Sequence, residues 1–110
     1  MTKRTTIEPT TVQQWQLENR DFVLLDCREQ NEFDYAHLPG CRLFPMSEIG
    51  SRLTELSEFQ NRTIVVYCHH GVRSLRVANW LSSNGFTDVY NMAGGIDRWS
   101  LEVDPRTPRY

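Results

Sequence analysis

The fold is decided by residues 63–74, which read TIVVYCHHGVRS. Thr63 to Tyr67 is an apolar, β-branched run, which is typical of a buried strand. The run leads directly into Cys68, and Arg73 follows where a helical pattern begins. The stretch therefore predicts a strand, a tight loop and the start of a helix, with a thiol at the first position of the loop.

Cys68 is a candidate nucleophile because of this position. A thiol there faces the positive end of a helix dipole, unpaired backbone N–H groups and the Arg73 guanidinium. All three favour the thiolate, which is the reactive form of cysteine. Gly71 lets the loop curl so that successive N–H groups point at one spot and form an anion-binding concavity. The alternative is a buried structural thiol, since free cysteine is among the most buried residue types.

Strands alternate with helices along the rest of the chain. Strands are expected over residues 5–8, 22–25, 41–44, 63–67 and 88–90. Helices are expected from Thr10 or Thr11, over 29–35, from Ser47 to Phe59, over 74–83 and over 96–99. The run at 22–25 is continuous rather than alternating, which suits a strand buried on both faces of a parallel sheet. The alternation predicts a parallel-stranded α/β domain with right-handed crossovers.

The predicted helices carry apolar residues at helical spacing, and these are expected to face the core. They are Val12, Trp15, Leu17, Ile49, Leu53, Leu56, Phe59, Leu75, Ala78 and Leu81. Thr10 or Thr11 is expected to cap the first helix, and Ser47 the helix that ends at Phe59.

Composition excludes several classes of protein. The length of 110 residues fits one domain. The net charge of −2 is spread over mixed charges, so there is no basic stripe for nucleic acid. No apolar run approaches the roughly 20 residues that span a bilayer, which predicts no membrane partner.

The ends of the chain and its cysteines indicate a location. Met1 to Thr6 has two positive charges but no apolar segment after them, so no signal peptide is expected. Three cysteines are an odd number, which suggests reduced thiols in the cytoplasm rather than a disulfide framework. Residues 104–110 are expected to form an extended tail packed over the domain, because two prolines exclude a helix.

Three motifs, in the same order along the chain, resemble the rhodanese family of sulfurtransferases. Residues 68–74 resemble the active-site loop of that family. Residues 26–29, 32–33 and 37–40 resemble its N-terminal signature, and residues 94–99 its C-terminal one. The resemblance implies a single rhodanese-like domain over residues 1–110. It also implies a central, about five-stranded parallel sheet with helices on both faces.

The resemblance also implies a reaction. The Cys68 thiolate would take the outer sulfur of a small donor such as thiosulfate and form a persulfide. A thiophilic acceptor, which is cyanide, a thiol or a protein, would then remove that sulfur. No cofactor is implied. The residues expected to bind the donor are His69, His70, Gly71, Val72 and Arg73.

Other interpretations of the loop stay open. Cysteine phosphatases resemble this arrangement but have five residues between cysteine and arginine, where this chain has four. A phosphatase or an arsenate reductase is therefore one alternative, and a non-catalytic binding module with a rhodanese fold is another. Arg73 would orient an anionic donor or, instead, pair with Asp26 or Glu32. His69 and His70 would line the mouth of the pocket, and no metal is expected, because adjacent ligands cannot easily face one tetrahedral centre.

The polar residues near the strand ends are expected to be structural. Asp26, Arg28 and Glu32 would form a polar network, and His37 would bond to backbone in its turn. Cys27 and Cys41 are expected to be packing residues, since a resolving role depends on a geometry that sequence does not show.

Overall fold

The computed structural model describes residues 5–110. The absence of a signal peptide was expected from residues 1–6, of which the first four lie outside the described residues.

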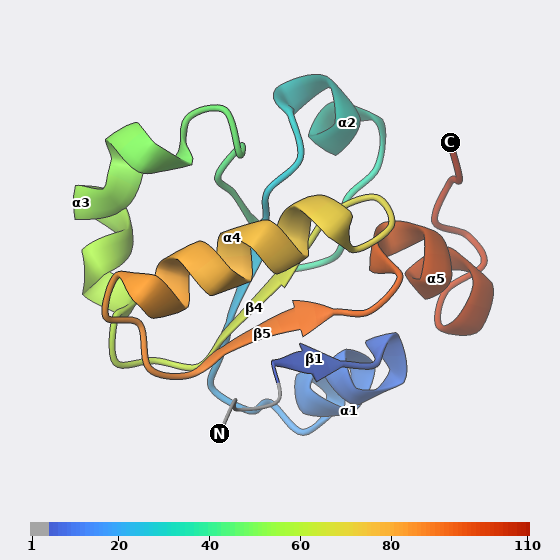
Figure 1. Cartoon of the computed structure of the whole chain (residues 1–110). Coiled ribbons are helices and arrows are strands. Elements are labelled where there is room, and N and C mark those ends of the chain that lie inside the picture. Colours follow the sequence, from blue (N-terminus) through green and yellow to red (C-terminus); the bar gives the residue numbers. More distant parts are fainter. Residues whose placement is uncertain (1–4) are drawn as a thin grey trace.

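Five parallel strands form the sheet, in the order β1-β5-β4-β2-β3 (Figure 1). The strands are β1 (Thr6–Ile7), β2 (Val23–Asp26), β3 (Arg42–Leu43), β4 (Ile64–Tyr67) and β5 (Val89–Met92). The strand that leads into Cys68, β4, lies at the centre of the sheet, between β5 and β2. The predicted five-stranded parallel sheet is confirmed, and each expected strand forms within two or three residues of its predicted bounds.

Helices cover both faces of the sheet. They are α1 (Pro9–Leu17), α2 (Gln30–Tyr35), α3 (Leu53–Leu56), α4 (Val72–Ser83) and α5 (Gly95–Glu102). One core cluster joins α3 and α4 to one face of the sheet, and a second joins α1 and α5 to the other. Figure 1 shows α4 lying along the sheet, with its first turn beside the carboxyl end of β4.

The central strand is buried on both faces, as the continuous apolar run predicts. Ile64, Val66 and Cys68 belong to the cluster under α3 and α4. Val65 and Tyr67 belong to the cluster under α1 and α5. Because side chains alternate along a strand, Cys68 lies on the α4 face of the sheet.

Two of the expected core residues are exposed. Leu17 is 70% exposed at the last position of α1, whose buried residues are Pro9 and Val12. Leu75 is 40% exposed, because the buried stripe of α4 instead includes Ser74, Val77 and Ala78. That stripe has the spacing i, i+3, i+4, and Leu75 lies about 100° around the helix from its first member.

The expected caps are also wrong in two helices. The first helix begins at Pro9, after the N-cap Glu8, because proline is well suited to the first helical position. Between Ser47 and Phe59 one helix was expected, but 3₁₀ turns at Ile49–Arg52 and Ser57–Phe59 flank the single turn of α3. Ser47 caps nothing there, since its hydroxyl donates to Glu29 Oε1 at 2.7 Å.

Candidate active site

The Cys68 sulfur lies in a ring of hydrogen-bond donors. Its Sγ accepts hydrogen bonds from the backbone N–H of Gly71 at 3.1 Å and of Ser74 at 3.3 Å. Gly71 has φ +100°, a left-handed conformation that glycine adopts readily and that turns its N–H toward the sulfur. The curled loop expected from the sequence is therefore present, and its amides face the thiol.

The Ser74 hydroxyl is a third donor that the sequence did not single out. Its Oγ lies 3.3 Å from Cys68 Sγ and 2.5 Å from Asn91 Oδ1. A hydroxyl has one hydrogen, so it donates to the sulfur or to the amide oxygen at any moment. The two backbone amides are consequently the fixed part of the ring.

Backbone N–H groups of α5 bind the carbonyl groups of the same loop. The N–H of Ile96 donates to the Cys68 carbonyl at 2.9 Å, and the N–H of Asp97 donates to the His69 carbonyl at 3.2 Å. Gly95 has φ +61°, and a Cβ there would collide with both of those carbonyl oxygens. Because the loop carbonyls are bound by α5, the loop N–H groups are left to face the sulfur.

The environment of Cys68 favours its thiolate. Its pKa is lowered first by a hydrogen bond from the Cys27 thiol and then by the Ser74 hydroxyl and the loop amides, against the effect of burial. The pKa of Cys27 is raised, because that thiol donates to Cys68 and is buried. The pair therefore has the negative charge on Cys68 and the proton on Cys27.

Very little of the Cys68 side chain is exposed to solvent. Cys68 is 1% exposed and Cys27 is 0% exposed. A donor thus reaches Sγ only if it is small or if the groups above the loop move.

Arg73 is paired with Glu32. Its Nη1 and Nη2 lie 2.7 Å and 2.9 Å from the two Glu32 oxygens, a bidentate ion pair that joins α4 to α2. This pair lowers the pKa of Glu32 to about 2, chiefly through the Arg73 hydrogen bonds. Of the two partners considered, Glu32 is the one found. Binding of an anionic donor by Arg73 stays a prediction.

Asp26 binds Arg28 instead, deep in the protein. The Arg28 guanidinium, which is 0% exposed, lies 2.9 Å and 2.6 Å from the two Asp26 oxygens and also donates to the Ala36 carbonyl. The Tyr67 hydroxyl donates to Asp26 Oδ2 at 2.8 Å. The expected contact is thus confirmed for Asp26 and Arg28, whereas Glu32 pairs with Arg73 and reaches Arg28 only through Tyr110. The expected backbone contact of His37 is present as well, with Nδ1 2.9 Å from the Phe33 carbonyl.

The tail packs over the domain, as expected, and it returns to the site. The Tyr110 ring stacks on His69 with 3.8 Å between centroids. Its hydroxyl accepts from Arg28 Nη1 at 2.9 Å and donates to Glu32 Oε2 at 2.7 Å. Tyr110 therefore links the buried Asp26 network to the Arg73 pair above the loop.

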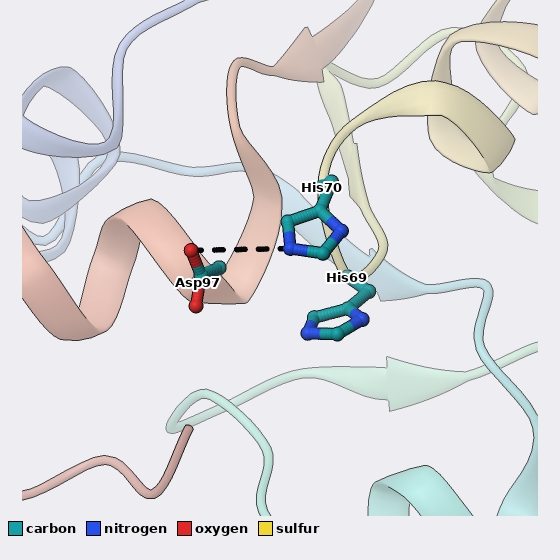
Figure 2. Close-up of side chains that lie close together, drawn as sticks. All are labelled: His69, His70 and Asp97. Atoms are coloured by element: carbon teal, nitrogen blue, oxygen red, sulfur yellow. Dashed lines mark ion pairs between the residues drawn. The ribbon is translucent and has the colours of Figure 1, made fainter. Parts of the chain in front are cut away.

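The two histidines lie on the outer side of the loop, with Asp97 of α5 beside them (Figure 2). His69 and His70 stack at 3.8 Å, and His70 Nε2 lies 3.9 Å from Asp97 Oδ2. One ligand-type atom from each of the three lies within 4.8 Å of the others, a grouping that the sequence did not suggest. However, Arg109 binds both oxygens of Asp97, at 2.8 Å and 3.2 Å, so the group is not prearranged for zinc. The absence of a metal stays a prediction.

Val72 completes the set of predicted loop residues. It is the first residue of α4 and is 65% exposed. Of the five predicted binding residues, Gly71 is buried and donates to Cys68 Sγ, while His70 and Val72 are exposed, and their binding of a donor stays a prediction.

A family model described as the rhodanese-like domain matches residues 8–102. This chain belongs to the rhodanese-like family. Within residues 5–110, none of its helices has the length and apolar character needed to cross a membrane.

Two relatives and one solved structure show how similar this chain is to other rhodanese-like proteins. The chain is 45% identical over 89 residues to the rhodanese-like/PpiC domain-containing protein 12, chloroplastic, of Arabidopsis thaliana, covering 79% of this rhodanese-like chain and 30% of the plant protein. It is 32% identical over 93 residues to the thiosulfate sulfurtransferase GlpE of Pseudoalteromonas translucida, covering 84% and 87% of the two chains. The crystal structure of a rhodanese-like domain protein from Staphylococcus aureus matches with a TM-score of 0.81 at 26% identity, covering 96% and 98%. The chain thus spans less than a third of the plant relative and most of the other two.

Proposed function

We propose that this chain is a sulfurtransferase that carries sulfane sulfur as a persulfide on Cys68. The observation that carries the proposal is the ring of donors around Sγ, in which two backbone amides and the Cys27 thiol favour the thiolate. A relative of similar length is named a thiosulfate sulfurtransferase, which supports the same chemistry.

The reaction has two steps. In the first, the Cys68 thiolate attacks the outer sulfur of a donor such as thiosulfate, and the donor S–S bond breaks to release sulfite. In the second, a thiophilic acceptor attacks the outer sulfur of the persulfide, and Cys68 leaves as a thiolate. The amides of Gly71 and Ser74 stabilise the thiolate before transfer, and loop N–H groups would stabilise the persulfide anion after it, which is the logic of an oxyanion hole.

The residues around Cys68 supply the binding groups in this proposal. Gly71 contributes its N–H, while His69, His70 and Val72, its neighbours in the chain, would line the approach to the sulfur. Arg73 adds positive charge near the thiolate even while it is paired with Glu32, and so attracts an anionic donor.

The rest of the proposal concerns the sulfur acceptor, the extent of the domain and the location of the protein. The acceptor in this proposal is a small thiophile or a protein, and residues 1–110 act as one domain. A cytoplasmic location and the absence of nucleic-acid partners stay predictions that rest on the sequence.

Sulfur uptake tests the proposal. Intact mass spectrometry after incubation with thiosulfate should show a gain of one sulfur atom, which cyanide removes. Cys68→Ser should gain none, while Cys41→Ser, which changes another free cysteine, should load as the wild type does. A wild-type chain that takes up no sulfur, or a Cys68→Ser chain that still does, would contradict the proposal.

The same samples separate the two alternatives. Hydrolysis of an aryl phosphate that depends on Cys68 would favour a phosphatase. We expect none, because the four-residue spacing is short and Arg73 is bound by Glu32. A Cys68→Ser variant that keeps full biological activity would instead favour a binding module.

A further inference from the structure

The strand ends bring a second thiol against the proposed nucleophile. The parallel ladder between β2 and β4 pairs Asp26 with Tyr67, so the next positions along the two strands are Cys27 and Cys68. The ladder continues there, since the N–H of Cys27 donates to the Tyr67 carbonyl at 3.1 Å. Both cysteines point to the α4 face of the sheet and belong to the same core cluster.

This register is compatible with a disulfide. Neighbouring strands lie about 4.8 Å apart, and disulfides join Cα atoms roughly 4.4 to 6.8 Å apart. The interaction of the two thiols also lowers the pKa of Cys68 and raises that of Cys27, as expected for neighbouring side chains. The third cysteine, Cys41, lies in the other cluster, on the opposite face of the sheet.

We propose that Cys27 is a resolving thiol that discharges the Cys68 persulfide as sulfide and leaves a Cys27–Cys68 disulfide. This step rests on the proposed function, because it needs a persulfide. Cys27 is 0% exposed, so its thiol can react with its neighbour but not with a molecule in solution. In this proposal Cys27 is a catalytic residue that reacts only with Cys68.

The step is balanced without an outside oxidant. The Cys27 sulfur attacks the inner sulfur, Cys68 Sγ, and forms the Cys27–Cys68 bond. The bond between Sγ and the outer sulfur breaks, and the outer sulfur leaves with its electron pair and a proton as hydrosulfide. The Cys27 thiol gives up its proton, two electrons pass to the sulfane sulfur, and an external dithiol then reduces the disulfide to restore both thiols.

The charge of Cys68 sets the order of events. While Cys68 is a thiolate, the hydrogen bond to it, burial and its negative charge together raise the pKa of Cys27, so Cys27 keeps its proton and serves as a donor. Transfer of a sulfur to Cys68 moves the negative charge to the outer atom and leaves Sγ neutral. Cys27 then loses its proton more easily and gains an electrophilic neighbour. The resolving step therefore becomes available only after loading.

The discharge of a loaded chain tests this inference. The protein is loaded with thiosulfate, desalted into thiol-free buffer, and followed by intact mass and by sulfide release. The wild type should release one equivalent of sulfide and end two hydrogen atoms lighter than the reduced chain. A digest without reductant should contain a peptide pair linked through Cys27 and Cys68. The rate should not depend on protein concentration, because the reaction is intramolecular.

Three variants make the result specific. Cys27→Ala and Cys27→Val should load more slowly than the wild type, because the thiolate loses one donor, and once loaded they should release sulfide at least about tenfold more slowly. Two different substitutions are used so that a folding defect in one does not decide the result. Cys41→Ala is the matched control and should behave as the wild type. A wild-type persulfide that forms but decays no faster than in the Cys27 variants, or a linked pair other than Cys27 with Cys68, would overturn this inference alone. Failure of every chain to load would overturn the proposed function and this step with it.

Discussion

Two segments surround the candidate nucleophile, and they contribute different kinds of group. The loop after β4, residues 68–71, is followed at once by α4, and the fixed groups aimed at Sγ are the backbone amides of Gly71 and Ser74. The segment that begins at the last residue of β2, residues 26–38, contributes charged side chains that are bound to partners, as in Asp26 with Arg28 and Glu32 with Arg73. The loop therefore acts on the sulfur through the conformation of its backbone, whereas the segment after β2 is held in place by ion pairs between its side chains and their partners.

This difference predicts which changes harm chemistry and which harm stability. An altered backbone in the loop should abolish sulfur uptake in a chain that still folds. An altered charge in the β2 segment should lower the free energy of unfolding. The predictions below run from the largest expected effect to the smallest.

Gly95→Ala should have the largest effect on activity. Its Cβ would collide with the carbonyls of Cys68 and His69 and push the loop away from its present position. A displacement of about 1 Å costs on the order of 100-fold in rate, so sulfur uptake from thiosulfate should fall by at least that factor.

Gly40→Ala is the matched control, since Gly40 also has a positive φ, +77°, but nothing lies within 4 Å of its added Cβ. Gly40→Ala should lose only about 1 to 2 kcal/mol of stability and keep its rate. Equal rates in the two variants would show that the loop position does not matter.

Arg28→Met should have the largest effect on stability. It leaves Asp26 charged and unpaired at 0% exposure, which costs about 3 to 5 kcal/mol. Arg73→Met removes an ion pair whose side chains are 33% and 16% exposed, and should cost about 1 kcal/mol. Urea unfolding of both variants measures the difference. If Arg73→Met were the more damaging, the assignment of the buried pair as the structural one would be wrong.

The Glu32 pair should make stability depend on pH. The pKa of Glu32 is lowered from 4.5 to about 2, chiefly by Arg73. A carboxyl with a depressed pKa in the folded state stabilises the protein above its unfolded pKa, and this is lost as pH falls. The wild type should therefore lose about 1 to 2 kcal/mol more than Glu32→Gln on acidification from pH 4.5 to about 2, after allowance for partial exposure. Urea unfolding at several pH values measures this, and parallel curves for the two proteins would contradict it.

Tyr110→Phe should have the smallest effect. It removes the hydroxyl that bridges Arg28 and Glu32 but keeps the ring that stacks on His69. A hydrogen bond contributes about 1 kcal/mol, so the tail should open more often and Cys68 should be alkylated up to about fivefold faster. Tyr35→Phe is the control, since Tyr35 contacts the Tyr110 ring edge-on. An unchanged alkylation rate in Tyr110→Phe would mean that the tail does not limit access.

The sequence predicted the loop well because the loop is a local feature. A strand, Cys68, Gly71 and the start of a helix lie within one short stretch, and their roles follow from that order. The five-stranded sheet followed in the same way, from alternating elements and a recognisable set of motifs. The two-sided burial of β4 was visible as an unbroken apolar run.

The residues that the sequence missed are brought to the site by long-range packing. Cys27 and Tyr110 are 41 and 42 positions away from Cys68, and no spacing rule connects them. The position of Cys27 would have followed from the β2–β4 register, since both cysteines come directly after their strands. Tyr110 belongs to an extended tail whose course has no periodicity to predict it. Asp97 lies on a helix that was expected, but its closeness to the histidines depends on how that helix docks on the loop.

Two predictions about helices were wrong, and the reasons lie within the helices themselves. Leu75 was placed inside because it shares helical spacing with Ala78 and Leu81, but the buried stripe that contains those two residues passes through Ser74 and Val77 and leaves Leu75 at its edge. The helix expected after Ser47 breaks into single turns. Side-chain hydroxyls compete with the helical backbone there, as Ser51 Oγ does at the Glu48 carbonyl and Ser57 Oγ at the Thr54 carbonyl.

The central claim is that the loop after β4 keeps a negative charge on the Cys68 sulfur at neutral pH. Thiolate absorbance in the ultraviolet measures that charge as a function of pH, with Cys68→Ser subtracted as the blank. The account predicts that the Cys68 signal persists well below the usual range of a cysteine pKa, because the thiolate accepts hydrogen bonds from Cys27 and from the loop amides. A signal that disappears at or above the ordinary cysteine pKa would contradict it.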